Sequence, residues 1–416
     1  MKKIILTCIS LLFSNSAISQ EIDFKDIILL IIENSTNIQI TKKNIEESYI
    51  DIRVQESKML PKLELKGGIS KTKQNNTTIN DRNISLNLNY NVFNGGKTLN
   101  SVRIYNNNQR KSLIEHKKNI AETILLITKV YYGVKKSRIL KKAYQIALNN
   151  NQNIMLKEKI KFENGIATKE SYLNAQSSYY NIKAKLEVLS TNISALESQY
   201  YSYTGTTISK KLPDIDLSDI IISSTMQETI ERAKVNNFDV QIAKINLENA
   251  NYNYQIAIAS NSPEIDLYGS VKNQTGFDDN TVSIGFNYTI PLYSGGGDIA
   301  KQKKGLVAKK ISKLKYNKVI SDSELSAINA WKNYTSSKIE FDSYQKSFEA
   351  IQLSLEAEQI KYDNGYSDSD SLLELQDKKL TIQQQYTSAV EKKITSVMDV
   401  LIATGDFTMQ NLEKIK

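Results

Sequence analysis

Two stretches in each half of the chain alternate between apolar and polar residues, which is the period of a β-strand with one apolar face. In the first half the alternation covers residues 63–69 and resumes over 84–92, beyond a stretch at 72–83 that is rich in Asn and Thr. The second half repeats the pattern over 265–271 and 282–290. The sequence therefore predicts two hairpins, each with one apolar face, one polar face and a polar loop.

Each predicted hairpin precedes a long stretch with the period of an α-helix. Residues 97–162 contain no proline and a single glycine, and residues 298–362 form a matching stretch. A helix over either stretch would be roughly 95–100 Å long, at about 1.5 Å per residue. In both, apolar residues recur in steps of three and four, the spacing of a coiled-coil seam. The seam residues are Ile120, Ile124, Ile127, Tyr131 and Val134 in the first stretch, and Phe341, Tyr344, Phe348, Ile351 and Leu355 in the second.

The predicted long helices need other helices as partners. No globular core is as deep as these helices are long, so we expect them to pack side by side with return helices over 169–203 and 370–403. A filament or a soluble helical bundle would show the same seams.

Glycines mark the ends of the long stretches. Glycine adopts the left-handed conformation that ends many helices. The predicted helix-to-helix turns are at Gly165 and Gly365, and the predicted strand-to-helix turns are at Gly95, Gly96, Gly295 and Gly296.

The two halves repeat one another. The sequence around Gly165 recurs around Gly365, and Gly95 recurs as Gly295, an offset of 200 residues in each case. Such an ordered repeat indicates a tandem duplication. The predicted division is a signal peptide at 1–19, a first repeat at 20–212, an irregular linker at 213–224 and a second repeat at 225–416, with both repeats forming one intertwined domain.

The first residues have the features of a secretory signal peptide. Lys2 and Lys3 precede an apolar stretch at 4–13, and the small residues Ala17 and Ser19 precede the expected cleavage point. The single cysteine of the chain lies inside this segment. The mature chain is therefore expected to have neither a disulfide nor a thiolate metal site.

Composition and charge exclude several classes of function. The 416-residue chain carries a formal charge of +9, or +7 without the two signal lysines, and has no basic run interleaved with aromatic residues. This charge indicates a solvated surface rather than a nucleic-acid interface. His116 is the only histidine and is expected at the surface. Without a phosphate loop, a catalytic pair or a metal-ligand cluster, the sequence predicts no enzyme, no cofactor and no metal.

Strands of about ten residues with one apolar face are typical of outer-membrane barrels. A soluble sandwich is the alternative, but the signal peptide and the lack of further strands favour the membrane. Four strands cannot close a barrel, and open sheet edges do not occur in lipid. Closure therefore needs other copies of the chain, and a trimer would supply twelve strands.

This ordered set of elements, present twice, resembles the TolC-like outer membrane efflux proteins. The segment Tyr-x-x-Pro-Leu-Tyr-Ser-Gly-Gly-Gly at 288–297 is similar to their strand-exit motif, although Asn91 stands in the first copy where Pro291 stands in the second. The resemblance implies an α+β membrane protein and a homotrimer. Its twelve-stranded β-barrel in outer-membrane lipid, four strands per chain, would continue as a long α-helical coiled-coil barrel in the periplasm.

The resemblance also implies a function. Such a protein is the passive exit duct of a tripartite efflux pump or a type I secretion system. An inner-membrane transporter and a periplasmic adaptor, or membrane fusion protein, open it at its periplasmic tip. The alternative is a periplasmic coiled-coil adaptor or scaffold without a membrane barrel.

Residues near the predicted tip are candidates for its aperture. Asp370 and Glu374 share a helix face because they are four residues apart. With Asp368 they would place carboxylates around a narrow mouth, and such rings select cations. The alternative is that Asp368 and Asp370 merely cap the return helix. The resemblance further implies that Tyr362 holds the closed state with a partner at the position of Ser171.

Overall fold

The computed structural model describes residues 24–74, 77–217, 219–274, 281–407 and 411, and the predicted signal peptide lies outside them. One order of elements occurs twice: two helices, a 3₁₀ turn, two strands, a long helix and a return helix. The first set is α1 (Phe24–Asn34), α2 (Thr36–Glu56), η1 (Ser57–Met59), β1 (Lys62–Gln74), β2 (Thr77–Phe93), α3 (Lys97–Glu163) and α4 (Lys169–Thr204). The second set is α5 (Met226–Asn236), α6 (Phe238–Ile258), η2 (Ala259–Asn261), β3 (Glu264–Gln274), β4 (Thr281–Thr289), α7 (Gly297–Asp363) and α8 (Ser369–Thr404).

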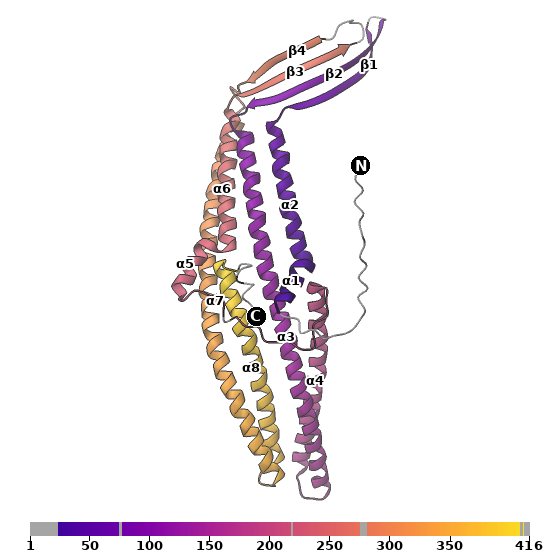
Figure 1. The fold of residues 1–416 in the computed structure, drawn as a ribbon, viewed down its shortest axis with the longest axis vertical. Helices are drawn as coiled ribbons and strands as arrows, with labels where there is room; N and C mark the ends of the chain where they lie inside the picture. Colours follow the sequence, from indigo (N-terminus) through magenta and orange to yellow (C-terminus); the bar gives the residue numbers. More distant parts are fainter. Residues whose placement is uncertain (1–23, 75–76, 218, 275–280, 408–410, 412–416) are drawn as a thin grey trace, which may run out of the picture.

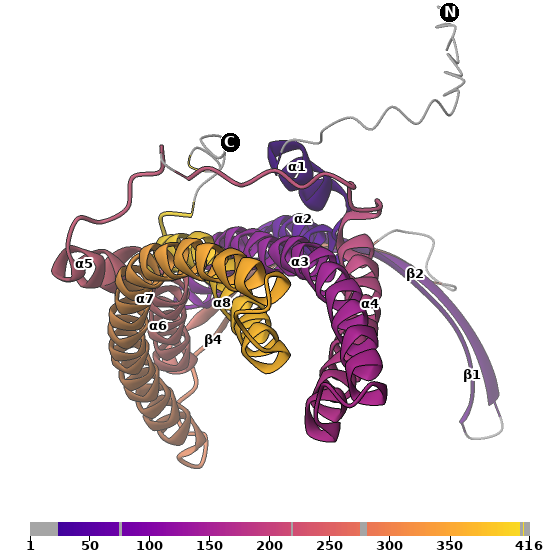
Figure 2. The same ribbon diagram turned by 90° about the horizontal axis from the view of Figure 1, so that it is seen from below.

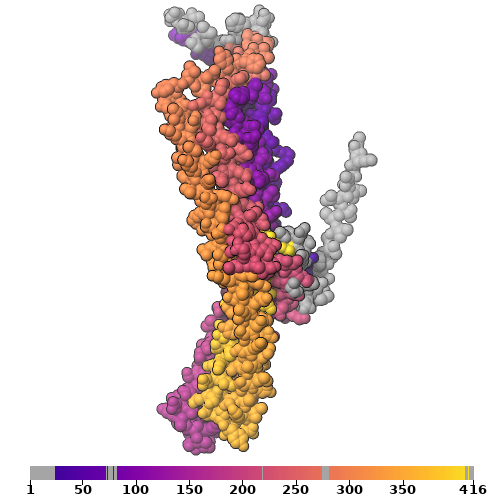
Figure 3. Space-filling view, turned by 90° about the vertical axis from the view of Figure 1, so that its left-hand side faces the viewer, coloured from indigo at the N-terminus to yellow at the C-terminus, as the bar shows by residue number. Residues whose placement is uncertain are grey.

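The molecule is elongated, with the strands at one end and the helix-to-helix turns at the other (Figure 1). Helices α3 and α7 each have 67 residues, which confirms both predicted long helices to within one residue at each end. Figure 3 shows α7 following the long axis down to the lower half, where it lies beside α8. Among the described residues, no helix has both the length and the apolar character needed to cross a membrane.

The strands form one antiparallel sheet in the order β1-β2-β3-β4. The register places apolar residues opposite one another, as in the pairs Leu65–Leu86 and Leu267–Phe286. Apolar side chains therefore gather on one face, since alternate residues of a strand point the same way. They are strongly exposed in the single chain, with Leu65 74% and Ile284 79% accessible. Among the described residues, neither β1 nor β4 has a second neighbouring strand.

The predicted hairpin loop over 72–83 is wrong in its extent. Strand β1 continues to Gln74 and β2 begins at Thr77, with Lys73 opposite Thr78. The prediction failed because it used apolar alternation as the sign of a strand. Ladder hydrogen bonds join backbone groups, so a stretch rich in β-branched threonine extends a strand without an apolar face.

The helices form a single curved layer (Figure 2). The helices that lie beside α3 and α7 change halfway along the layer. Beside the sheet, α2, α3, α6 and α7 lie in that order, so α2 and α7 are the free edges. Towards the tip the order is α4, α3, α8 and α7, because α3 and α7 extend the full length. The layer is an arc rather than a closed bundle, and no described element of the chain covers its concave side.

The largest apolar core lies at the middle of the molecule, where the two halves of the layer meet. It is formed by buried side chains from α1, α3, α4 and α8, among them Tyr131 of α3, which is 1% exposed. The segment 213–224 has no helix or strand among its described residues. It is nevertheless part of this core, because Ile215 and Ile220 are buried in it. The Ile215 amide also donates to the Tyr132 hydroxyl at 3.0 Å.

Candidate functional site

The turns 164–168 and 364–368, which together we term the tip, have the same backbone design. Gly165 and Gly365 adopt φ of +71° and +76°, the left-handed conformation predicted for them. The amides that follow donate back to the last helical turn, from Ile166 to Lys161 O and from Tyr366 to Lys361 O, at 2.8 Å in both. These bonds supply donors to carbonyl groups that have no N–H partner inside the helix. The tip is therefore formed by two tight, equivalent turns.

A buried polar contact joins the two hairpins just above the tip. The Tyr362 hydroxyl, at the end of α7, donates to the Glu158 carboxylate of α3 at 3.3 Å. Both side chains are buried, with Tyr362 7% and Glu158 3% exposed. The Lys161 ammonium lies 2.7 Å from the same Glu158 oxygen and so compensates its buried charge. Burial and the nearby Glu158 carboxylate raise the pKa of Tyr362 to about 12, so its hydroxyl is protonated at neutral pH.

Two further contacts support this junction. The Lys157 and Lys161 ammonium groups lie 5.4 and 5.3 Å from the centre of the Tyr362 ring. Lys157 also forms an ion pair with Asp363 at 3.6 Å. Cations over an aromatic face are attracted by its quadrupole, more strongly where water is excluded. The α3–α4 hairpin is thus held to the α7–α8 hairpin through the last turns of α3 and α7.

Ser171 does not meet Tyr362 in the structure. Its hydroxyl lies 3.0 Å from the Thr168 hydroxyl, and its amide donates to that same group at 3.1 Å. Ser171 therefore belongs to the N-terminal cap of α4. The partner of Tyr362 within the chain is Glu158, which sequence reasoning missed. One signal was present: Glu158 lies 200 residues before Glu358, the offset that relates the two tip turns.

The three carboxylates predicted for the aperture lie in two different surroundings. Asp368 is the N-cap of α8, and its carboxylate accepts from the Ser371 amide at 2.8 Å. That bond lowers the pKa of the Asp368 carboxyl, so the cap is charged at neutral pH and is lost as the pH falls through this lowered pKa. Asp370 and Glu374 are exposed on the first two turns of α8. Of the three, only Asp368 is the N-cap residue of α8.

The strand-to-helix turns lie at the opposite end of the long helices. Gly96 and Gly296 are the N-cap positions of α3 and α7, with φ of +80° and +78°. A Cβ atom on Gly95 would lie 2.4 Å from the Ser262 Cβ, which only glycine avoids. The sheet is thereby joined to the helical layer through tight turns.

His116 departs from the prediction of a solvated side chain. It is half-buried between α3 and α2, where its Nδ1 atom lies 2.8 Å from the Thr41 hydroxyl. In the part of the chain that the structure describes, no group of three or more His, Cys, Asp or Glu side chains could hold a metal ion.

Comparisons with known proteins agree with this geometry. A model of the family described as outer membrane efflux protein matches residues 27–206 and 229–405. The outer membrane protein TolC of Vibrio cholerae is 24% identical over 275 residues, which cover 61% of this chain and 61% of that protein. The match thus spans less than two thirds of TolC.

Solved structures with the same fold extend over nearly the whole chain. The CmeC outer membrane channel of Campylobacter jejuni superposes with a TM-score of 0.80 at 16% identity, covering 91% of this chain and 84% of CmeC. The open state of the MtrE outer membrane channel of Neisseria gonorrhoeae gives a TM-score of 0.79 at 16% identity, and the match covers 92% of this chain and 88% of MtrE. The outer membrane protein VceC of Vibrio cholerae gives a TM-score of 0.78 at 14% identity, and the match covers 91% of this chain and 95% of VceC.

Proposed function

This chain belongs to the outer membrane efflux protein family, and from that premise we propose that three copies form the passive exit duct of a tripartite efflux pump or a type I secretion system. The family places the chain in the outer membrane, and its helices form the long periplasmic part. In the proposed assembly an inner-membrane transporter supplies the energy, and a periplasmic adaptor couples it to the tip. No catalytic role is assigned to the chain.

The observation that carries the proposal is the exposed apolar face shared by all four strands. A sheet with this face in water would be an aggregation hazard, whereas in a bilayer the same face contacts lipid. The outer edges of β1 and β4, which pair with no described strand, require partners, because lipid cannot satisfy backbone donors and acceptors. Pairing β4 of one copy with β1 of the next gives twelve strands from three chains.

The helical layer supports the same closure. Its free edges expose apolar side chains, including Ile50 and Val54 on α2 and Val307 and Leu314 on α7. Side-by-side packing of α7 against α2 of the next copy would cover these residues and turn three arcs into one cylinder. The alternative of a soluble adaptor is not favoured, because it leaves both the apolar sheet face and these helix edges exposed.

We also propose that the chain arose from one duplicated unit. Residues 20–212 and 225–416 would be its two copies, joined by the linker at 213–224. The repeated order of elements and the matching tip turns support this division.

The aperture of the proposed duct lies at the tip. Asp370 and Glu374 of three copies would place six carboxylates around the mouth. This ring would attract cations, and a bound polyvalent cation would block the channel. Tyr362 and Glu158 would hold the two hairpins together in the closed state. Opening then requires that this buried contact be broken in each chain.

Single-channel recording in planar bilayers tests the proposed function. We expect the purified protein to conduct ions with cation selectivity. Replacing Asp370 and Glu374 together by alanine should weaken block by a trivalent cation at least about tenfold, since the ring charge is removed. The matched control replaces Glu187 and Asp342, which are exposed carboxylates away from the tip, and should leave block unchanged. A protein that forms no pores would support a soluble adaptor instead, and block that is equal in all variants would remove Asp370 and Glu374 from the aperture.

A further inference from the structure

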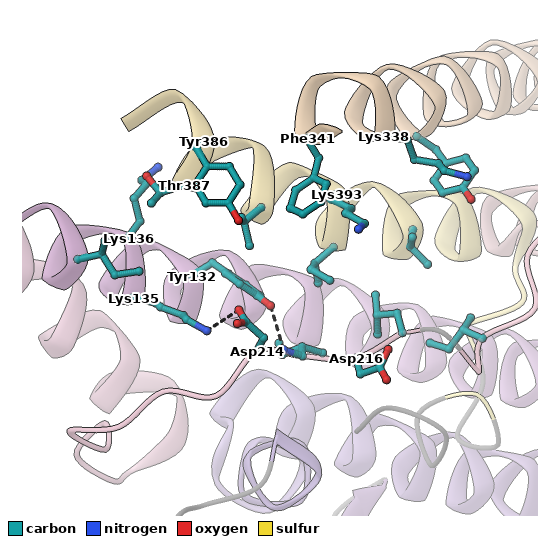
Figure 4. Close-up of a pocket in the computed structure, with 18 of the residues that line it drawn as sticks. Tyr132, Lys135, Lys136, Asp214, Asp216, Lys338, Phe341, Tyr386, Thr387 and Lys393 are labelled. Atoms are coloured by element: carbon teal, nitrogen blue, oxygen red, sulfur yellow. Dashed lines mark hydrogen bonds and ion pairs between the residues drawn. The ribbon is translucent and has the colours of Figure 1, made fainter. Parts of the chain in front are cut away.

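A cleft lies beside the central core, where α3, α7 and α8 meet the linker (Figure 4). We term it the equatorial cleft. Its volume is about 570 Å³, within the range of about 300–1,000 Å³ that is typical of small-molecule sites. The linker crosses the convex side of the helical arc, so the cleft is on the side away from the concave surface (Figure 2). It is remote from the tip and takes no part in the proposed aperture.

The walls of the cleft are mainly apolar and aromatic. Phe341 of α7 and Tyr386 of α8 face it, and Tyr132 of α3, which is 2% exposed, lies at its base. The Phe341 and Tyr386 rings lie 5.9 Å apart, and aliphatic side chains of α8 and the linker complete the surface. Such a lining suits the aliphatic or aromatic body of a ligand, because it removes apolar surface from water.

The polar part of the lining is dominated by lysines. Four of them, Lys135, Lys136, Lys338 and Lys393, border the cleft. Two are compensated by carboxylates: Lys135 pairs with Asp214 at 2.5 Å, and Lys136 pairs with Glu391 at 3.0 Å. Asp216 is the other acidic residue of the lining.

The remaining two lysines lie over aromatic rings. The Lys393 ammonium is 3.9 Å from the centre of the Phe341 ring, and the Lys338 ammonium is 5.6 Å from the centre of the Tyr334 ring. A ring face attracts a cation but leaves its formal charge in place, whereas an anion would neutralise it. Both lysines are therefore suited to receive an anionic group beside an apolar surface.

We propose that the equatorial cleft binds a small amphiphilic anion, with its apolar body against Tyr132, Phe341 and Tyr386 and its anionic group between Lys338 and Lys393. The ligand class is a monoanion, such as a carboxylate or sulfonate, on an aliphatic or aromatic body of drug size. Bound there, it contacts α3 of the first half, α7 and α8 of the second half, and the linker between them. It would therefore tie the two halves together at the middle of the molecule.

A natural reporter stands beside the cleft. The chain has a single tryptophan, Trp331, and its ring centre lies 5.7 Å from that of Tyr334, which lines the cleft. The emission of the full-length purified protein can therefore be followed while decanoate is added. Decyltrimethylammonium is the comparison, because it has the same chain length and the opposite charge.

We expect saturable binding of one decanoate per chain, at least tenfold tighter than binding of decyltrimethylammonium. The variant with Lys338→Gln and Lys393→Gln should bind decanoate at least fivefold more weakly. The control with Lys332→Gln and Lys346→Gln removes two exposed lysines of α7 outside the lining and should bind like the parent. Heat-resistant oligomers on gels verify that each variant is folded.

Three results would overturn the proposal. The first is equal affinity for the two amphiphiles, which would show that the lysines do not select charge. The second is a response to decanoate that never saturates, which is the behaviour of partition into lipid or detergent. The third is unchanged binding of decanoate by the folded variant that lacks Lys338 and Lys393.

Discussion

Replacing Ile284 by arginine is expected to prevent assembly of the protein in the outer membrane. Ile284 lies near the middle of β4, on the apolar face, and its side chain is 79% exposed in the single chain. An arginine on the lipid face near the bilayer midplane costs about 2–4 kcal/mol. The cost is incurred in every copy of the proposed trimer. The heat-resistant oligomer in the outer-membrane fraction should therefore decrease at least about tenfold.

The neighbouring residue provides the matched control. Ser283 precedes Ile284 in β4 and therefore points to the opposite, polar face. Ser283→Arg adds the same side chain to the same strand but directs it into water inside the proposed barrel. We expect this variant to assemble nearly as well as the parent. Equal loss in both variants, or in neither, would contradict the assignment of the apolar face to lipid.

Removing the contact between Tyr362 and Glu158 is expected to favour the open state of the tip. A hydrogen bond to a charged group contributes about 1.5–3 kcal/mol, and each 1.4 kcal/mol is a factor of about ten in an equilibrium. Tyr362→Phe should therefore raise the open probability of single channels at least about tenfold. Glu158→Gln should have a larger effect, because it also removes the ion pair with Lys161.

A control variant and a double variant test whether the effect comes from this contact. Tyr366→Phe removes a hydroxyl from a side chain that is 85% exposed in the tip turn, and it should leave the currents unchanged. The double variant of Glu158 and Tyr362 should resemble Glu158→Gln alone, since residues in direct contact are not additive. Tyr362→Phe channels that behave like Tyr366→Phe channels would show that the contact does not hold the tip closed.

Much of the fold could be predicted from local patterns. The two long helices contain no proline and are followed by glycines that take the left-handed conformation, so their bounds could be predicted from the sequence. The two hairpins follow from the alternation of apolar and polar residues, whereas the pairing of β2 with β3 was not predicted. The hairpin extensions beyond residue 72 were missed, because ladder hydrogen bonds need no apolar side chain.

The contact between Tyr362 and Glu158 was harder to predict from the sequence, for a different physical reason. Which residue Tyr362 meets depends on the rotation of α3 about its axis relative to α7, and a periodic pattern constrains that rotation only loosely. Ser171 lies one turn into the return helix, whereas Glu158 lies on the long helix directly opposite. The burial of the linker residues Ile215 and Ile220 was missed for the same reason, since it depends on contacts between distant segments.

The central claim is that four strands and an open arc of helices become complete only when three copies join. Native mass spectrometry of the protein extracted from the outer membrane tests this claim most directly. The account predicts one species with the mass of three mature chains, which dissociates to single chains only on denaturation. A stable single chain, or a complex of any other number of chains, would contradict it.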